Sequence, residues 1–234
     1  MYREIAPASD PYGLYACAWT RETERSYEAR IVPDACVDLI WQRESGELFI
    51  AGPDTHAHVG RIDPGTLVGL RFSPGSAPAA LGVPAHSIRD GRVSLDSLWS
   101  PARARELAEA LAETTTNAAA QRVLEVAVTS HADGERDRAA TGVLRLLRSG
   151  TRVGAIAGAV DLSERQLHRR CLTAFGYGPK VLDRVLRFHR AVRMARSGVA
   201  LADVAYQTGY ADQSHLAREI KALSGVSFTS LVRS

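Results

Sequence analysis

Two stretches of sequence decide the C-terminal fold: VGAIAGAVDLSERQLHRRCLTAFG at residues 153–176 and LADVAYQTGYADQSHLAREIKALSG at residues 201–225. Each begins with a short apolar segment, passes through a turn and continues as a polar segment that ends in glycine. Positions match at an offset of 48 residues before the turn and 49 after it, so the second copy has one extra residue there. Because turns tolerate insertions and helix interiors do not, the pattern predicts a duplicated helix-turn-helix unit.

Small and turn-forming residues stand where such a unit needs them. Ala157 and Ala205 are small at the place where two helices must cross closely. Asp161 and Gly209 stand at the turns, where residues that tolerate a positive φ are favoured. Ser163 is a suitable N-cap for the second helix of the first unit.

The second helix of each unit has an apolar face and a polar face. Apolar residues recur at helical spacing and should face inward, at Leu167, Cys171 and Phe175 and again at Leu216, Ile220 and Leu223. The outward positions hold side chains that can hydrogen-bond base edges, and these DNA-binding candidates are Arg165, His168, Arg169, Gln213, Ser214, His215 and Arg218. A helical bundle whose charges are merely solvated is the alternative interpretation.

Residues 139–234 resemble the DNA-binding domain of AraC-type bacterial transcription regulators. The resemblance depends on IAGAVDLSERQLHRRCLTAFGYGP and, more characteristically, DVAYQTGYADQSHLAREIKALSGVSF. It implies two helix-turn-helix subdomains joined by a long helix, with both recognition helices entering the major groove on one face of double-stranded DNA. It also implies RNA polymerase as a partner if the protein is an activator.

The segment between the two units predicts the joining helix. From Lys180 to Arg196, apolar residues follow the spacing of a buried stripe, at Val181, Val185, Phe188, Val192 and Ala195. The segment spans about 25 Å, shorter than the DNA repeat of about 34 Å, so we expect the bound DNA to bend. Six basic residues lie in it, and about half of them are expected to serve only as scaffold.

Charge is divided unequally along the chain. Residues 141–234 contain 15 Lys and Arg against 6 Asp and Glu, a net charge of +9, whereas residues 1–140 have a net charge of −6. The basic part favours a polyanion partner. The opposite charges also allow the two parts to dock on each other, which would weaken DNA binding.

Composition excludes several other classes of protein. The sequence has no run of about 18 apolar residues that could form a membrane helix, and its start, MYREIAPASD, lacks a signal peptide's apolar core. Cys17, Cys36 and Cys171 are far apart, which argues against a disulfide framework or a four-thiolate zinc site. We expect a cytoplasmic protein without a cofactor.

The N-terminal half changes character near residue 75. Short runs rich in β-branched, aromatic or alternating residues predict strands at 12–20, 28–32, 36–42, 47–51 and 66–72, with a hairpin turn at ESG, 44–46. Helical periodicity follows in APAALGVP, 101–113 and 117–130. We therefore expect a domain at 1–130 that is β-rich over 1–75 and helical over 76–130, a linker at 131–138, and a DNA-binding domain at 139–234.

Two phrases, IVPDACVDLIW and LRFSPGSAPAALGVPAHSIRDGRVSLDSLW, resemble an uncharacterised sensor-type domain that precedes AraC-type DNA-binding domains. This resemblance implies a cupin-like β-barrel with trailing helices and fixes no ligand. The expected fold class is α+β with two domains, the second of them all-α.

Alternation within the strand around Asp38 indicates a pocket. Val37, Leu39 and Trp41 should point one way, and Cys36, Asp38 and Ile40 the other. An acid in an apolar run needs a partner, and Arg71 on another predicted strand is the candidate. One interpretation makes Asp38, Cys36, Trp19 and Arg71 the polar end of a ligand-binding pocket; a purely structural ion pair is the other.

Two histidines, His56 and His58, share a face if they lie on a strand, which is half of a cupin metal site. The following residues supply no carboxylate in the expected place, so exposed loop histidines are the commoner explanation and no metal is expected.

Three functions from different classes remain open. The first is a sequence-specific DNA-binding transcription regulator, not an enzyme, controlled by a small-molecule effector or by dimerisation through its N-terminal domain. The second is a cupin-type metal-binding or enzymatic domain fused to a DNA-binding domain. The third is a constitutive DNA-binding module whose N-terminal half serves only for assembly.

Overall fold

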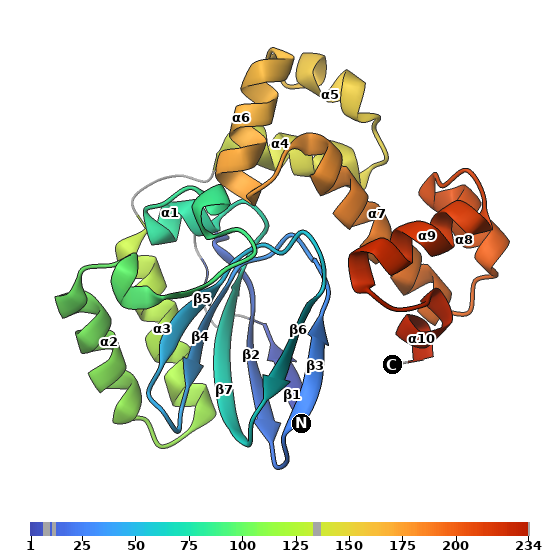
Figure 1. The fold of residues 1–234 in the computed structure, drawn as a ribbon. Coiled ribbons are helices and arrows are strands. Elements are labelled where there is room, and N and C mark those ends of the chain that lie inside the picture. The colour runs from blue at the N-terminus through green and yellow to red at the C-terminus, as the bar shows by residue number, and fades with distance from the viewer. Residues whose placement is uncertain (7–9, 11–12, 133–136, 234) are drawn as a thin grey trace.

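A computed structural model describes residues 1–6, 10, 13–132 and 137–233 (Figure 1). Strands fill the first part of the chain, and residues 137–233 are helical, as the sequence predicts. The strands are β1 (Tyr2–Ile5), β2 (Tyr15–Thr23), β3 (Tyr27–Ile31), β4 (Asp38–Gln42), β5 (Leu48–Ala51), β6 (His58–Ile62), β7 (Gly65–Phe72) and β8 (Arg92–Ser94).

The expected cupin-like barrel takes the form of two antiparallel sheets. Six strands pair in the order β1-β2-β7-β4-β5-β8, and β3 pairs with β6 in a separate two-stranded sheet. The predicted hairpin at 44–46 joins β4 to β5, and Gly46 in it has a φ of 74°. The sequence did not indicate β1, β6 or β8, because β1 and β6 are largely exposed and β8 has only three residues, so none carries a clear alternation.

Helices after β7 cover one face of the six-stranded sheet (Figure 1). Their apolar residues, Leu107, Leu111, Leu124 and Val128, share a core with the inward residues of β4 and β7. The helical periodicity expected over 101–113 and 117–130 therefore corresponds to two helices that pack on the sheet. The elements are α1 (Ala77–Leu81), the short 3-10 helices η1 (Ala85–Ile88) and η2 (Leu95–Ser97), α2 (Pro101–Ala112) and α3 (Asn117–His131).

Both helix-turn-helix units are present in the C-terminal part. Ser163 and Gln166 form a reciprocal capping box at the start of the second helix of the first unit, and Asp161 and Gly209 have positive φ values of 54° and 79° at the two turns. The elements are α4 (Arg138–Arg148), α5 (Val153–Ala159), α6 (Glu164–Phe175), α7 (Pro179–Arg196), α8 (Leu201–Thr208), α9 (Gln213–Ser224) and α10 (Phe228–Arg233).

The helix α7 crosses both helical cores. Leu182 and Val185 pack in the first core, around α4, α5 and α6, whereas Phe188, Ala191 and Val192 pack in the second, around α8 and α9. The predicted stripe is therefore confirmed at Val185, Phe188 and Val192. Because α7 must contact two cores on different sides, Leu182 and Ala191 are also fully buried.

The expected linker at 131–138 falls partly outside the described residues, which omit 133–136. Of the rest, His131 ends α3, and Asp137 caps α4 by accepting hydrogen bonds from the backbone N–H groups of Ala139 and Ala140.

Candidate DNA-reading surface and N-terminal cavity

The second helix of each helix-turn-helix unit, α6 and α9, presents a polar face to solvent. Arg165, His168 and Arg169 are exposed on α6, and Gln213, Ser214 and Arg218 are exposed on α9. The opposite faces are buried through Leu167, Cys171 and Phe175 in α6 and through Leu216, Ile220 and Leu223 in α9. Six of the seven candidates are therefore free to approach a DNA groove, on helices fixed by their own apolar faces.

His215 differs from the other candidates because it is half-buried. Its Nδ1 accepts a hydrogen bond from the Ala211 N–H at 3.3 Å, and its ring packs edge-on against Tyr210 with centroids 5.4 Å apart. The sequence predicted an exposed side chain here. The ring instead braces the longer turn of the second unit.

Four of the six basic side chains on α7 are engaged within the protein. Arg184 pairs with Glu219 at 2.6 Å and Arg187 with Asp183 at 3.2 Å. Arg190 donates to the Arg148 carbonyl at 2.6 Å, and Arg196 donates to the Leu231 carbonyl at 3.1 Å. The expectation that about half of these residues serve the scaffold agrees with these contacts.

A cavity of about 370 Å³, called here the N-terminal cavity, lies between the two sheets. Apolar residues of both sheets line it, among them Ile31, Ile40, Phe49 and Leu67. The alternation expected around Asp38 is confirmed: Cys36, Asp38 and Ile40 face the cavity, whereas Val37, Leu39 and Trp41 pack in the core on the other side of the sheet. All four ligand-site candidates, Trp19, Cys36, Asp38 and Arg71, line the cavity.

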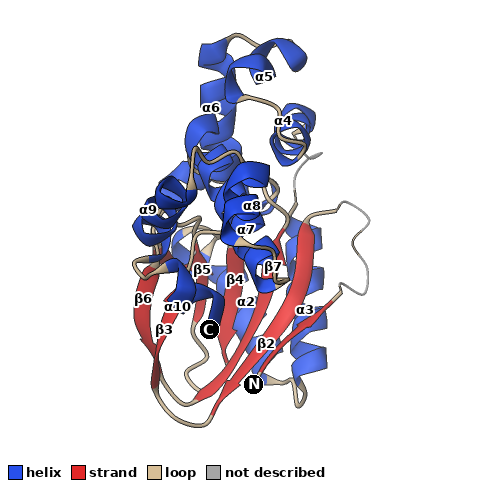
Figure 2. Cartoon of the chain, turned by 90° about the vertical axis from the view of Figure 1, so that its right-hand side faces the viewer, coloured by secondary structure: helices blue, strands red, loops and turns tan. Residues whose placement is uncertain are grey.

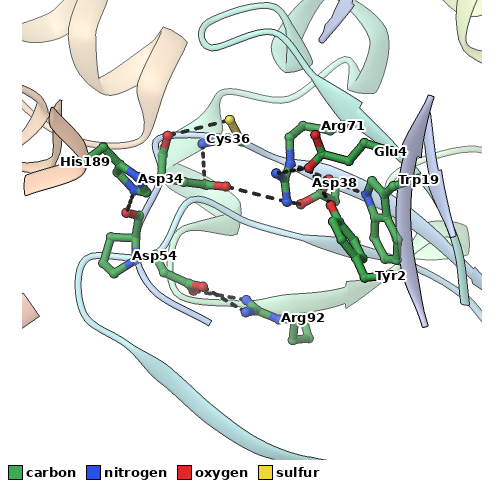
Figure 3. A network of polar contacts seen from close by, with 11 residues as sticks. Tyr2, Glu4, Trp19, Asp34, Cys36, Asp38, Asp54, Arg71, Arg92 and His189 are labelled. Atoms are coloured by element: carbon green, nitrogen blue, oxygen red, sulfur yellow. Dashed lines mark hydrogen bonds and ion pairs between the residues drawn. The ribbon is translucent and has the colours of Figure 1, made fainter. Parts of the chain in front are cut away.

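Three of these candidates form one polar cluster (Figure 3). Arg71 Nε lies 3.1 Å from Asp38 Oδ1, and the Trp19 indole N–H donates to the same oxygen at 2.9 Å. The strand register brings them together, since Asp38 and Arg71 face each other across β4 and β7, and Trp19 faces Gly69 across β2 and β7. A Cβ at position 69 would lie 2.1 Å from Trp19 Cε2, so the indole reaches Asp38 only because residue 69 is glycine.

Carboxylates outnumber the guanidinium in this cluster. Arg71 also lies 3.6 Å from Asp34 and 3.8 Å from Glu4, and the Tyr2 hydroxyl donates to Glu4. Burial raises the pKa of Asp38, although Arg71 beside it acts in the opposite direction. Burial lowers the pKa of Arg71, but Asp38 and Asp34 outweigh that effect and keep the guanidinium charged.

The fourth candidate, Cys36, is held by Asp34 at the edge of the cluster. Its N–H donates to Asp34 Oδ1 at 2.9 Å, and its thiol donates to the Asp34 carbonyl at 3.6 Å. Burial and the charge of Asp34 raise the pKa of Cys36 well above its usual value. The group is therefore a thiol near neutral pH and is poorly suited to act as a nucleophile.

A second ion pair at the cavity was not predicted from sequence. Arg92 of β8 makes a two-pronged contact with Asp54, with Nη–Oδ distances of 3.0 and 2.8 Å. Both residues line the cavity, and Asp54 is buried. Asp54 lies in a loop and β8 is three residues long, so the sequence offered only two isolated charges and no periodicity that would pair them.

The two histidines weighed as half of a metal site, His56 and His58, lie in different environments. His56 is in the loop before β6, exposed, with Nδ1 3.8 Å from Asp90, and His58 begins β6 at the rim of the cavity. Over the described residues, no group of three or more His, Cys, Asp or Glu is placed to hold a metal ion. The same part of the chain has no helix with the length and apolarity needed to cross a membrane.

Two family models match separate parts of the chain. Residues 156–234 match a family described as a helix-turn-helix domain, and residues 3–94 match a domain of unknown function, DUF6597. None of the curated proteins matches the chain significantly. The first match runs from within α5 to the end of α10 and includes α6 and α9, and the second includes every residue that lines the N-terminal cavity except Tyr2.

Among solved structures, the chain is similar to ToxT from Vibrio cholerae. One crystal structure of ToxT from strain O395 is 12% identical, with a TM-score of 0.47 over 92% of this chain and 95% of that chain. Another, bound to (E)-4-(8-methylnaphthalen-1-yl)but-3-enoic acid, is 11% identical, with a TM-score of 0.49 over 92% of this chain and 97% of that chain.

Proposed function

Because this chain is a DNA-binding transcription regulator with an AraC-type helix-turn-helix domain, we propose that α6 and α9 read one DNA site while the N-terminal cavity binds an effector. The observation that carries this proposal is the pair of exposed polar faces on two helices with buried apolar faces, joined through one helix that belongs to both cores. Pairing of two chains is a further part of the proposal, as is contact with RNA polymerase if the protein is an activator.

In this function, the exposed side chains of α6 and of α9 each recognise part of the DNA site. Arg165, His168 and Arg169 read bases from α6, and Gln213, Ser214 and Arg218 do so from α9, because Arg and Gln can make paired hydrogen bonds to guanine and adenine. His215 acts by positioning the turn. Contacts of basic residues with phosphates supply most of the affinity and none of the sequence choice.

The effector that suits the cavity is a small molecule with an apolar body and one polar group. Ile40, Phe49 and Leu67 would cover the body, and the polar group would exchange hydrogen bonds with Asp38 and Arg71. Trp19 and Cys36 complete this polar end. Since the carboxylates near Arg71 outnumber it, a hydrogen-bond donor suits this end better than an anion.

Binding in the cavity can affect the C-terminal helices directly, because residues 29–36 line the cavity and also contact those helices. Along residues 29–36, Ile31 and Asp34 face the cavity, and Ala35 is buried in the first helical core. The backbone carbonyl of Pro33 contacts His189 of α7, beside Asp34 (Figure 3). Ala35 holds a positive φ of 63°, a strained conformation for a residue with a Cβ. A ligand that moves this wall therefore moves α7 with it.

The test of DNA reading is binding by the full chain to double-stranded sites selected from a random pool. Replacing Arg169 or Arg218 with Ala should weaken binding to the selected site by about 1–3 kcal/mol and relax the choice at particular bases. Equal weakening on selected and random DNA would mean that these two roles are misassigned. Arg105→Ala on the exposed side of α2 serves as the control.

The test of effector binding is a thermal-shift screen of a metabolite extract. A fraction that stabilises the wild-type chain should fail to stabilise Ile40→Trp, whose larger side chain fills the cavity. If no fraction raises the melting temperature, or if the shift persists in the filled variant, the cavity is not the effector site.

The domain division at 1–130, 131–138 and 139–234 is part of this proposal, with a cytoplasmic location. Each family match falls inside one of the two larger ranges, which supports the division. Limited proteolysis that cuts between residues 131 and 138 before any other site would test it; a first cut inside a described helix would argue against it.

A further inference from the structure

The two recognition helices end in the same way. Gly176 follows α6 with a φ of 83°, and Gly225 follows α9 with a φ of 75°, so both helices close on a left-handed glycine. The last carbonyl groups of a helix lack partners within the helix and carry a partial negative charge. These two ends are equivalent positions of the duplicated sequence.

An arginine from the N-terminal part, residues 1–130, contacts each of these ends. Arg89, which follows η1, donates from Nη1 to the Gly176 carbonyl at 3.2 Å. Arg30, on β3, donates from Nη1 to the Ser224 carbonyl at 3.0 Å. Gly176 stands one residue beyond α6, and Ser224 is the last residue of α9, so the two carbonyl groups are one position apart in the duplicated pattern. Two unrelated segments of the N-terminal part thus contact a backbone carbonyl at the C-terminal end of each recognition helix.

The surroundings of both ends are closely packed. A Cβ at Gly176 would lie 2.5 Å from Pro53 Cγ, and one at Gly225 would lie 2.9 Å from Arg30 Nη1. The Ala57 N–H also donates to the Leu223 carbonyl of α9 at 2.8 Å. Each helix end is therefore seated against the N-terminal part, and Figure 2 shows α9 above β6 and β3.

The contacts lie at the far ends of the helices from the residues assigned to DNA. Arg165 and Arg169 on α6, and Gln213 and Arg218 on α9, remain exposed while the ends are held. Docking of the N-terminal part thus leaves the reading faces uncovered, contrary to an inhibition by simple masking. What the contacts can change is the position of one helix relative to the other.

We propose that the N-terminal part sets the spacing between the two recognition helices, and that Arg30 and Arg89 are the residues through which it does so. This inference rests on the proposed reading of one DNA site by α6 and α9. If α7 alone joined the two helix-turn-helix units, bending of α7 would change the distance between α6 and α9. Two further anchors at the helix ends remove that freedom and restrict binding to DNA whose two half-sites stand at one separation.

The experiment compares the affinities of the full chain for related duplexes. The site is first selected from a random pool with the wild-type chain. Duplexes are then made with one or two base pairs added or removed between the half-sites, and one duplex has a half-site scrambled. Wild type should prefer one spacing. The Arg30→Ala/Arg89→Ala variant should lose about tenfold of that preference, since two charged hydrogen bonds are removed.

Three controls make the result specific. Arg30→Lys/Arg89→Lys retains charged donors and should keep part of the preference. Arg105→Ala/Arg122→Ala removes the same charge from exposed positions on α2 and α3 and should keep all of it. Affinity for the duplex with one scrambled half-site should be the same in the alanine variant and wild type.

The outcomes separate this proposal from the proposed function. An unchanged spacing preference in the alanine variant overturns the inference, as does an equal change in affinity for every duplex. If the double variant melts below the assay temperature, each single variant should lose a part of the preference, and two unchanged single variants overturn the inference equally. If wild type selects no duplex at all, the DNA-reading function fails instead.

Discussion

At the scale of single residues, the polar end of the N-terminal cavity depends on Arg71, whose guanidinium group lies near three carboxylates. Arg71 faces Asp38, Asp34 and Glu4, and only Asp38 is held by the Trp19 indole as well. An ion pair in this setting depends on its hydrogen bonds, because removal of one partner leaves the other charge poorly solvated. Arg61 and Asp63, 2.7 Å apart, form an ion pair between the same two kinds of group, but both side chains are exposed to solvent, so this pair serves as a comparison.

Asp38→Ala should therefore destabilise the protein by about 3 kcal/mol, since the charge of Arg71 loses its nearest partner in a largely buried site. Urea unfolding at neutral pH measures the change. The matched variant Asp63→Ala should leave the free energy of unfolding almost unaltered, because solvent and salt screen an exposed pair. Equal effects of the two substitutions would contradict this account of the cavity.

The cysteines should react slowly in the folded protein. Burial raises the pKa of the Cys17 thiol to about 11 and that of Cys171 to about 12. The reactive thiolate is favoured only as the pH rises through these values, so alkylation of Cys17 at pH 8 should be about 100-fold slower than in the unfolded chain. Rates measured against pH by mass spectrometry test this; a Cys17 rate that levels off below pH 9 would exclude it.

At the scale of elements, the two recognition helices begin with different caps. Ser163 accepts from the Gln166 N–H at 3.3 Å within a capping box, whereas Asp212 accepts from the His215 N–H at 2.6 Å. Both caps satisfy a backbone donor that the helix leaves unpaired. The carboxylate at Asp212 adds a favourable interaction with the positive end of the helix.

Ser163→Ala and Asp212→Ala should each destabilise the protein by about 1 kcal/mol, and Asp212→Asn by less, because asparagine keeps the cap without the charge. Chemical denaturation gives the three values. Ser163→Asp is the control for the first unit and should keep full stability. A loss in Asp212→Asn as large as in Asp212→Ala would show that charge, and not the hydrogen bond, dominates.

At the scale of the whole molecule, the net positive charge of the C-terminal part and its contacts with the N-terminal part are separate features. The net charge of +9 over residues 141–234 favours DNA. The contacts with the N-terminal part at α6 and α9 are instead made by Arg89 and Arg30, and at α7 the His189 side chain contacts the Pro33 carbonyl. From the sequence, the opposite net charges suggested that the two parts dock on each other. These contacts do not depend on those charges, because each is made to a backbone carbonyl.

Affinity of the full chain for random duplex DNA should depend strongly on salt. About six or more phosphate contacts predict a loss of about 1000-fold between roughly 50 and 200 mM salt, through release of counterions. Lys180→Ala and Arg193→Ala, at exposed positions of α7, should each reduce the slope of log affinity against log salt by about 1 if they touch phosphates. Fluorescence anisotropy measures the slopes, and a salt-independent affinity would contradict this mode of binding.

Local patterns predicted much of the fold and part of the site. The duplicated units, the stripe at Val185, Phe188 and Val192, and the alternation around Asp38 were readable because each is periodic in sequence. The ion pair of Asp54 with Arg92 was not readable, since its partners are 38 residues apart and neither lies in a patterned segment. His215 was placed wrongly in solvent, because helical spacing ignores the contact of its ring with the preceding turn.

The sequence by itself determined the class of the protein, the two helix-turn-helix units and the side of β4 that faces a cavity, because short-range periodicity governs which face of a helix or strand is buried. Only the tertiary structure decided what shares the wall of that cavity and what holds the ends of α6 and α9. Those contacts join Arg30 to Ser224 and Arg89 to Gly176, residues that are 194 and 87 positions apart. Packing between distant segments fixes such contacts, and no local pattern of residues encodes them.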